Sequence, residues 1–116
     1  MTSQTNQAVQ KTPSDTIKEM VRRIVEHFQP EQIILFGSHA RGTAGPDSDV
    51  DLLIVLRDAA HKRKKTVEIY RLLAGIGLSK DVYVATPEEI ERDRNIVGTI
   101  IRPAMREGRV LYERAA

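Results

Sequence analysis

The chain has 116 residues, of which 41% are hydrophobic and 4% aromatic, and this length suits one compact domain with an aliphatic core. Its 18 Lys and Arg residues against 16 Asp and Glu residues give a net charge of +2, which is too small to indicate nucleic acid as a direct partner, and the lack of cysteine excludes disulfides and thiolate metal sites. No apolar run approaches the roughly 20 residues that a membrane helix needs, so we expect a cytoplasmic protein without membrane contact.

The first third of the chain is expected to form a tail, a helix and a strand. Residues 1–12 are polar and aperiodic, which predicts a disordered N-terminal tail before a single domain over residues 13–116. A capping threonine, a proline and apolar residues at helical spacing predict a helix over residues 13–28. The short apolar run 33–36, which ends at Gly37, predicts a buried strand.

The remaining chain alternates between strand and helix patterns. The expected elements are a strand over 50–56, a helix over 59–77, a strand over 81–85, a capped helix from Thr86, a helical segment over 95–107 interrupted at Pro103, and an edge strand over 110–112. These elements predict an α/β (α+β) domain, with a small mixed β-sheet of three to four strands flanked by helices.

A glycine and a serine at the end of the first strand are candidates for binding phosphate. Gly37 lacks a Cβ, so its backbone can approach a ligand closely. Ser38 adds a hydroxyl and an amide donor at a turn where a short helix can begin, and free amides at such a start favour phosphate oxygens.

Two aspartates open the second strand. Because side chains alternate along a strand, the carboxylates of Asp49 and Asp51 point to the same face while Val50 points into the core. Asp81 opens the next strand and joins the other two carboxylates if the strands are neighbours. Carboxylates this close repel one another unless a cation joins them, and hard oxygen ligands suit Mg²⁺ or Mn²⁺.

Three such carboxylates support two-metal phosphoryl transfer, in which one ion holds the triphosphate and the other activates the attacking hydroxyl. Asp49 and Asp51 are the expected bridging ligands of both ions, and Asp81 is a ligand or the general base. Read in isolation, however, an Asp-x-Asp pair is as often a turn former as a metal site.

The run from Leu35 to Gly42, followed by Ser48-Asp49-x-Asp51, resembles the motif of the DNA polymerase beta nucleotidyltransferase superfamily, in particular its minimal nucleotidyltransferase (MNT, MntA-like) branch. The resemblance covers roughly residues 15–113. It implies Mg²⁺ and ATP or another nucleoside triphosphate as donor. It carries over Gly37 and Ser38 as triphosphate-binding residues, and Asp49, Asp51 and Asp81 as catalytic metal ligands.

Two further residues of the motif are included among the nucleotide-binding candidates. Arg41 matches a residue of the branch and contacts phosphate or holds local structure. Ser48 precedes the paired aspartates and is also suited to ordering the turn. The basic run from Lys62 to Lys65 is most simply a solvated helix face.

The resemblance also implies a biological role. Members of the branch serve as antitoxins that add AMP to a tyrosine hydroxyl of an all-helical HEPN-type toxin, so a complex with such a toxin is expected. We expect no second domain to hold the acceptor, which favours a partner protein as acceptor. Two alternatives remain open: an antitoxin that neutralises its partner by binding with little transfer, and a nucleotidyltransferase acting on a small molecule.

Overall fold

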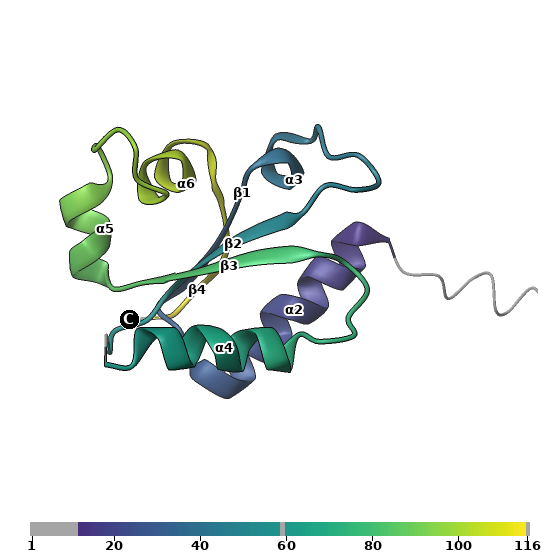
Figure 1. The fold of residues 1–116 in the computed structure, drawn as a ribbon, viewed down its shortest axis with the longest axis horizontal. Coiled ribbons are helices and arrows are strands. Elements are labelled where there is room, and N and C mark those ends of the chain that lie inside the picture. Colours follow the sequence, from purple (N-terminus) through teal and green to yellow (C-terminus); the bar gives the residue numbers. More distant parts are fainter. Residues whose placement is uncertain (1–11, 59, 116) are drawn as a thin grey trace, which may run out of the picture.

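A computed structural model describes residues 12–58 and 60–115, so the predicted N-terminal tail lies, apart from Thr12, outside the described residues. The elements, in chain order, are α2 (Pro13–Phe28), β1 (Gln32–Phe36), α3 (Ser38–Arg41), β2 (Val50–Val55), α4 (Lys62–Leu72), β3 (Lys80–Ala85), α5 (Pro87–Asp93), α6 (Ile101–Glu107) and β4 (Arg109–Glu113) (Figure 1).

Two helices begin at capping threonines that the sequence predicts, and each threonine forms a capping box. At the start of α2 the Thr12 hydroxyl accepts a hydrogen bond from the Asp15 amide at 3.1 Å, and the Asp15 carboxylate accepts one from the Thr12 amide at 3.2 Å. Thr86 and Glu89 repeat the arrangement at α5. Each box satisfies amides that the first helical turn leaves without partners, and so fixes where the helix begins.

The strands form one mixed sheet of order β3-β2-β1-β4 in the described part of the chain. β1 is antiparallel to β2 and β4, whereas β2 and β3 are parallel. The expected mixed sheet flanked by helices is therefore confirmed, with β3 and β4 as its edge strands. The parallel pairing determines where the candidate site lies, because it brings the first residues of β2 and β3 to the same end of the strands.

Helices cover both faces of this sheet (Figure 1). α2 and α4 lie on one face, where Met20 and Ile24 of α2 pack with Val50, Leu52 and Ile54 of β2. On the opposite face α5 and α6 cover a smaller cluster, which contains Ile34, Phe36, Leu53, Val55 and Ile101. The alternation along β2 thus sends even-numbered residues to the α2–α4 face and odd-numbered residues, including Asp51, to the α5–α6 face.

Two helix boundaries differ from the sequence prediction. α4 is shorter than the expected helix over 59–77, since it ends at Leu72 before Gly75, which has a φ of 77°. The segment over 95–107 is not interrupted at Pro103, because α6 begins only at Ile101 and Pro103 lies in its first turn. A proline is tolerated there, since the amides of a first turn have no helical partner in any case. Within residues 12–58 and 60–115, no helix is long and apolar enough to cross a membrane.

Candidate active site

The turn after β1 places a glycine against a carboxylate. Gly37 has φ 76° and ψ −157°, a conformation that is essentially restricted to glycine. A Cβ built at Gly37 would collide with the carboxylate of Asp51. The Gly37 carbonyl accepts hydrogen bonds from the amides of Ala40 and Arg41, both at 3.1 Å. Gly37 therefore caps the short helix α3, and Ser38 becomes its first residue.

The carboxylates of Asp49, Asp51 and Asp81 lie at one edge of the sheet. Asp51 pairs with Asp81 in the register of the parallel strands β2 and β3, so the two side chains share the α5–α6 face. Asp49 stands two residues earlier, and its Oδ1 accepts a hydrogen bond from the Ser79 hydroxyl at 2.5 Å. The structure thus brings together the three acids that the sequence pattern singles out.

Electrostatics at this edge are dominated by negative charge. Burial raises the pKa of Asp51, and the neighbouring carboxylates of Asp81 and Asp49 raise it further, while His39 and Arg41 act weakly in the opposite direction. None of the three aspartates belongs to an ion pair among the residues that the structure describes. Negative charge at this edge is therefore left without a direct cationic partner.

A closed metal cage is not formed. In the described ranges no three His, Cys, Asp or Glu side chains converge closely enough to hold a metal ion as they stand. The donor set nevertheless suits a divalent cation, because hard carboxylate oxygens repel one another here and one of them is partly desolvated. Mg²⁺ typically takes only one or two protein carboxylates and completes its coordination with water and substrate phosphates.

Arg41 and Ser48 have structural partners in addition to any contact with nucleotide. The Arg41 guanidinium donates to Glu107 of α6 at 3.0 Å, which ties α3 to α6. The Ser48 hydroxyl accepts a hydrogen bond from the Gly45 amide at 2.8 Å and closes the turn before β2. His39 Nε2 lies 3.3 Å from the Ser48 carbonyl oxygen. Ser48 therefore shapes the loop between α3 and β2, and Arg41 fixes α3 against α6.

Two residues near the carboxylates were missed by reasoning from sequence. Ser79 stands two positions before Asp81, as Asp49 stands before Asp51, and this equal offset is the signal that could have revealed the contact between them. Tyr83 follows Asp81 on the same face of β3. Burial raises the pKa of Tyr83, and the charges of Asp81 and Asp51 add to the effect.

A strand-turn-helix with Gly37 and Ser38, beside paired aspartates on the next strand, is the arrangement of a nucleotidyltransferase. Residues 17–110 match the model of the nucleotidyltransferase domain family, and the chain belongs to that family. This assignment confirms the resemblance drawn from the sequence motif.

Individual relatives match smaller parts. The chain is 36% identical over 86 residues to the bifunctional uridylyltransferase/uridylyl-removing enzyme of Pseudomonas putida, and the match covers 72% of this chain and 9% of that protein. It is 38% identical over 56 residues to the "Putative protein adenylyltransferase MJ1305" of Methanocaldococcus jannaschii, which covers 47% of this chain and 38% of that protein. The chain thus spans well under half the length of both curated relatives.

Solved structures agree with the fold. A "putative nucleotidyltransferase" from Sulfolobus solfataricus superposes with a TM-score of 0.61 at 22% identity, over 85% of this chain and 78% of that chain. At this identity the likeness shows a shared fold. The mixed sheet and its flanking helices are therefore an architecture that this chain shares with the Sulfolobus solfataricus protein.

Proposed function

We propose that this protein transfers a nucleoside monophosphate, AMP from ATP in the simplest case, to a hydroxyl group on a partner protein. One observation carries the proposal: the parallel register of β2 and β3 places Asp51 beside Asp81, and the backbone of Gly37 lies against the Asp51 carboxylate. A phosphate-binding turn and a group of carboxylates thereby face one position, where a triphosphate can be bound and attacked.

Gly37 and Ser38 bind the triphosphate in this proposal. Because Gly37 has no side chain, the Asp51 carboxylate can lie directly against the backbone of the turn that leads into α3. Ser38, as the first residue of α3, offers a backbone amide and a hydroxyl to the same group. Positioning of the donor in this way is a main source of catalysis in phosphoryl transfer, since little covalent chemistry falls to the protein.

Asp49, Asp51 and Asp81 would hold the divalent cations, Mg²⁺ or Mn²⁺, that nucleotidyltransferases of this family generally use. When bound, such ions neutralise the charge of the triphosphate and lower the pKa of the acceptor hydroxyl. Ser79 holds the Asp49 carboxylate in one orientation through its hydrogen bond. Asp81, on the edge strand, serves in this proposal either as one of these ligands or as the base that takes up the proton of the acceptor.

The finer assignment rests on the relatives and on the sequence motif. One curated relative is named as a protein adenylyltransferase, which supports a protein acceptor and ATP as donor. The MNT-like motif supports an antitoxin whose acceptor is a tyrosine of a HEPN-type toxin. Another relative is named as a uridylyltransferase, so UTP is the competing donor that an experiment must include.

The proposal is tested by transfer of radiolabel from α-labelled ATP or UTP, with Mg²⁺, to a purified HEPN-type toxin. Asp49→Asn with Asp51→Asn keeps the shape of both side chains but removes their charge, and we expect transfer to fall at least about 100-fold. Asp47→Asn is the matched control, because Asp47 is exposed in the same loop.

Transfer by the double variant at the wild-type rate would refute a catalytic role for the carboxylates. A double variant that transfers no label but still protects cells fully would show that neutralisation works by binding instead. Transfer from UTP in preference to ATP would retain the chemistry and correct the donor.

A further inference from the structure

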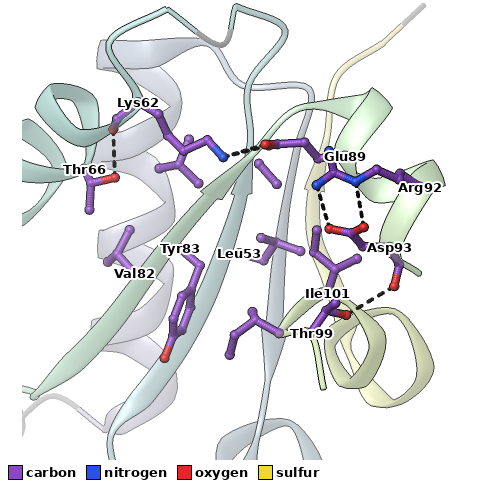
Figure 2. A pocket seen from close by; sticks show the side chains of 13 residues that line it. Leu53, Lys62, Thr66, Val82, Tyr83, Glu89, Arg92, Asp93, Thr99 and Ile101 are labelled. Carbon is purple, nitrogen blue, oxygen red and sulfur yellow. Dashed lines mark hydrogen bonds and ion pairs between the residues drawn. The ribbon is translucent and has the colours of Figure 1, made fainter. Parts of the chain in front are cut away.

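A cleft of about 380 Å³ follows the outer edge of β3, between the first turns of α4 on one side and α5 and α6 on the other (Figure 2). Its walls include Leu53 and Tyr83 from the sheet, Glu89 from α5, and Thr99 to Ile101 at the start of α6. Because β3 is an edge strand, the cleft can be reached from outside the sheet. The proposed transfer reaction leaves this cleft without a role.

The cleft is lined by the residues of β3 that directly follow Asp81. Tyr83 lines it and lies two residues beyond Asp81 on the same face of β3, a rise of about 7 Å along a strand. Figure 2 shows the Tyr83 hydroxyl pointing away from the Lys62–Glu89 pair. Tyr83 is therefore the lining residue of β3 that follows Asp81 on the same face of the strand.

The cleft and the phosphate-binding turn lie on opposite sides of the acids. Gly37 follows β1, and β2 separates β1 from β3, so about 10 Å of sheet lies between Gly37 and the edge strand. A triphosphate bound at Gly37 and Ser38 thus approaches the carboxylates from the β1 side. A second substrate that approaches from the cleft would meet the same carboxylates from the β3 side.

Charge in the cleft is neutralised internally. The Lys62 ammonium donates to Glu89 at 2.7 and 2.9 Å, and the Arg92 guanidinium donates to Asp93 at 2.7 and 2.8 Å (Figure 2). Cations already paired in this way offer little attraction to a triphosphate, which needs unpaired cations or a metal. A neutral, partly apolar group fits the lining better.

An apolar rim lies on the segment between α5 and α6. Val97 is 78% exposed, Ile96 47% and Ile100 38%, a concentration of exposed aliphatic side chains beside the cleft. The segment is held in place by Thr99, whose hydroxyl donates to the carbonyls of Asp93 and Ile96 and accepts from the Arg102 amide. Exposed aliphatic groups on a fixed segment are typical of a protein-docking surface.

We propose that the cleft along β3 is the acceptor pocket, which holds a neutral aromatic side chain bearing a hydroxyl, as in tyrosine, while the segment 96–100 contacts the surrounding acceptor protein. This inference rests on the proposed nucleotidyl transfer. The acceptor oxygen bonds to the α-phosphorus of the triphosphate, the bond from that phosphorus to the bridging oxygen breaks, pyrophosphate leaves, and the acceptor proton passes to Asp81.

The test maps two probes separately by NMR on the isotope-labelled chain. A non-hydrolysable ATP analogue with Mg²⁺ should shift the amide signals of residues 37–42, and N-acetyl-tyrosinamide should shift those of Tyr83, Glu89 and residues 99–101. Ile100→Glu, at the rim, should weaken the tyrosinamide response at least about fivefold and change the affinity for the ATP analogue less than twofold. Val110→Glu is the matched control, because Val110 is 53% exposed on the opposite edge strand.

Signals of the cleft that respond to the ATP analogue and not to the tyrosine amide would overturn the inference and make the cleft a nucleobase site. No response of the cleft to tyrosinamide at tens of millimolar would also overturn it. If residues 37–42 fail to respond to the ATP analogue, the proposed function itself fails. The wild-type map decides the question even if Ile100→Glu does not fold.

Discussion

The two faces of the sheet differ in composition although the same strands form both of them. On the α2–α4 face, β2 contributes Val50, Leu52 and Ile54 to a continuous apolar core. On the α5–α6 face, the same strand begins with a partly buried aspartate, Asp51, before its apolar residues Leu53 and Val55. The α2–α4 face therefore contributes mainly to the stability of the fold. The α5–α6 face carries carboxylates that repel one another at one end of the strands and a cleft along β3.

Neighbouring residues of β2 thus serve different purposes, because one points into the apolar core and the next points to the face that carries the carboxylates. A substitution on the α2–α4 face should lower the free energy of unfolding and leave the chemistry of the folded molecules intact. A substitution among the carboxylates should impair the chemistry and leave the free energy of unfolding equal or higher. Four substitutions test this separation, from the largest expected effect on stability to the smallest.

Leu52→Ala should produce the largest loss of stability. Leu52 has no exposed surface in the core between the sheet and α2 and α4, and a truncation there removes apolar contacts and leaves a cavity. We expect the free energy of unfolding to fall by about 2–5 kcal/mol, measured by urea denaturation. Nucleotide binding per folded molecule should be unchanged, and a loss of affinity in fully folded protein would show that the two faces are coupled.

Gly37→Ala should affect both properties, since the turn joins the sheet to the site. The backbone conformation of Gly37 costs about 1–3 kcal/mol for another residue, and a methyl group there would collide with the Asp51 carboxylate. Thermal unfolding and binding of an ATP analogue are the measurements, and both should decline. Gly42→Ala is the control, because Gly42 also has a positive φ, of 79°, but a Cβ there has open space around it. Equal loss of binding in both variants would remove Asp51 from the explanation.

The Lys62–Glu89 pair on the cleft should make a small, pH-dependent contribution. The hydrogen bond from Lys62 lowers the pKa of Glu89, followed by the bond from the Thr86 amide, against the opposing effect of burial. A lowered folded-state pKa stabilises the protein above the unfolded-state value of about 4.3, and the benefit disappears as the pH falls through the lower folded value.

Glu89→Gln should therefore be less stable than the wild type by under about 1 kcal/mol at pH 7, since the pair is partly exposed. The difference should shrink as the pH is lowered below 4 in parallel urea titrations. A difference that persists unchanged at low pH would mean that Glu89 acts through packing rather than charge.

Asp51→Asn should change stability least, and in the opposite direction. Burial and the charges of Asp81 and Asp49 disfavour the ionised carboxylate of Asp51, so a neutral amide relieves that repulsion. In metal-free buffer the free energy of unfolding should equal or exceed that of the wild type. A clear loss of stability would show that the Asp51 carboxylate holds the fold together, and the separation between the two faces would then be wrong.

Much of the local structure of this protein can be predicted from its sequence alone. Capping boxes at Thr12 and Thr86 fix two helix starts, and the apolar run 33–36 forms the buried strand β1, because these features depend on neighbours within a few residues. The boundary at Pro103 was predicted wrongly, since a proline reads as a break unless one knows that the helix begins only two residues earlier.

The site was determined in part by the sequence and completed by the tertiary structure. The spacing of two between Asp49 and Asp51 predicts a shared face from strand geometry alone, although β2 begins only at Val50. Whether Asp81 joins them depends on β3 lying parallel to β2 in a register that pairs Asp51 with Asp81. The contact of Ser79 with Asp49, the ion pairs of Arg41 and Lys62 and the cleft beside Tyr83 join residues distant in sequence, and only packing of the elements could decide them.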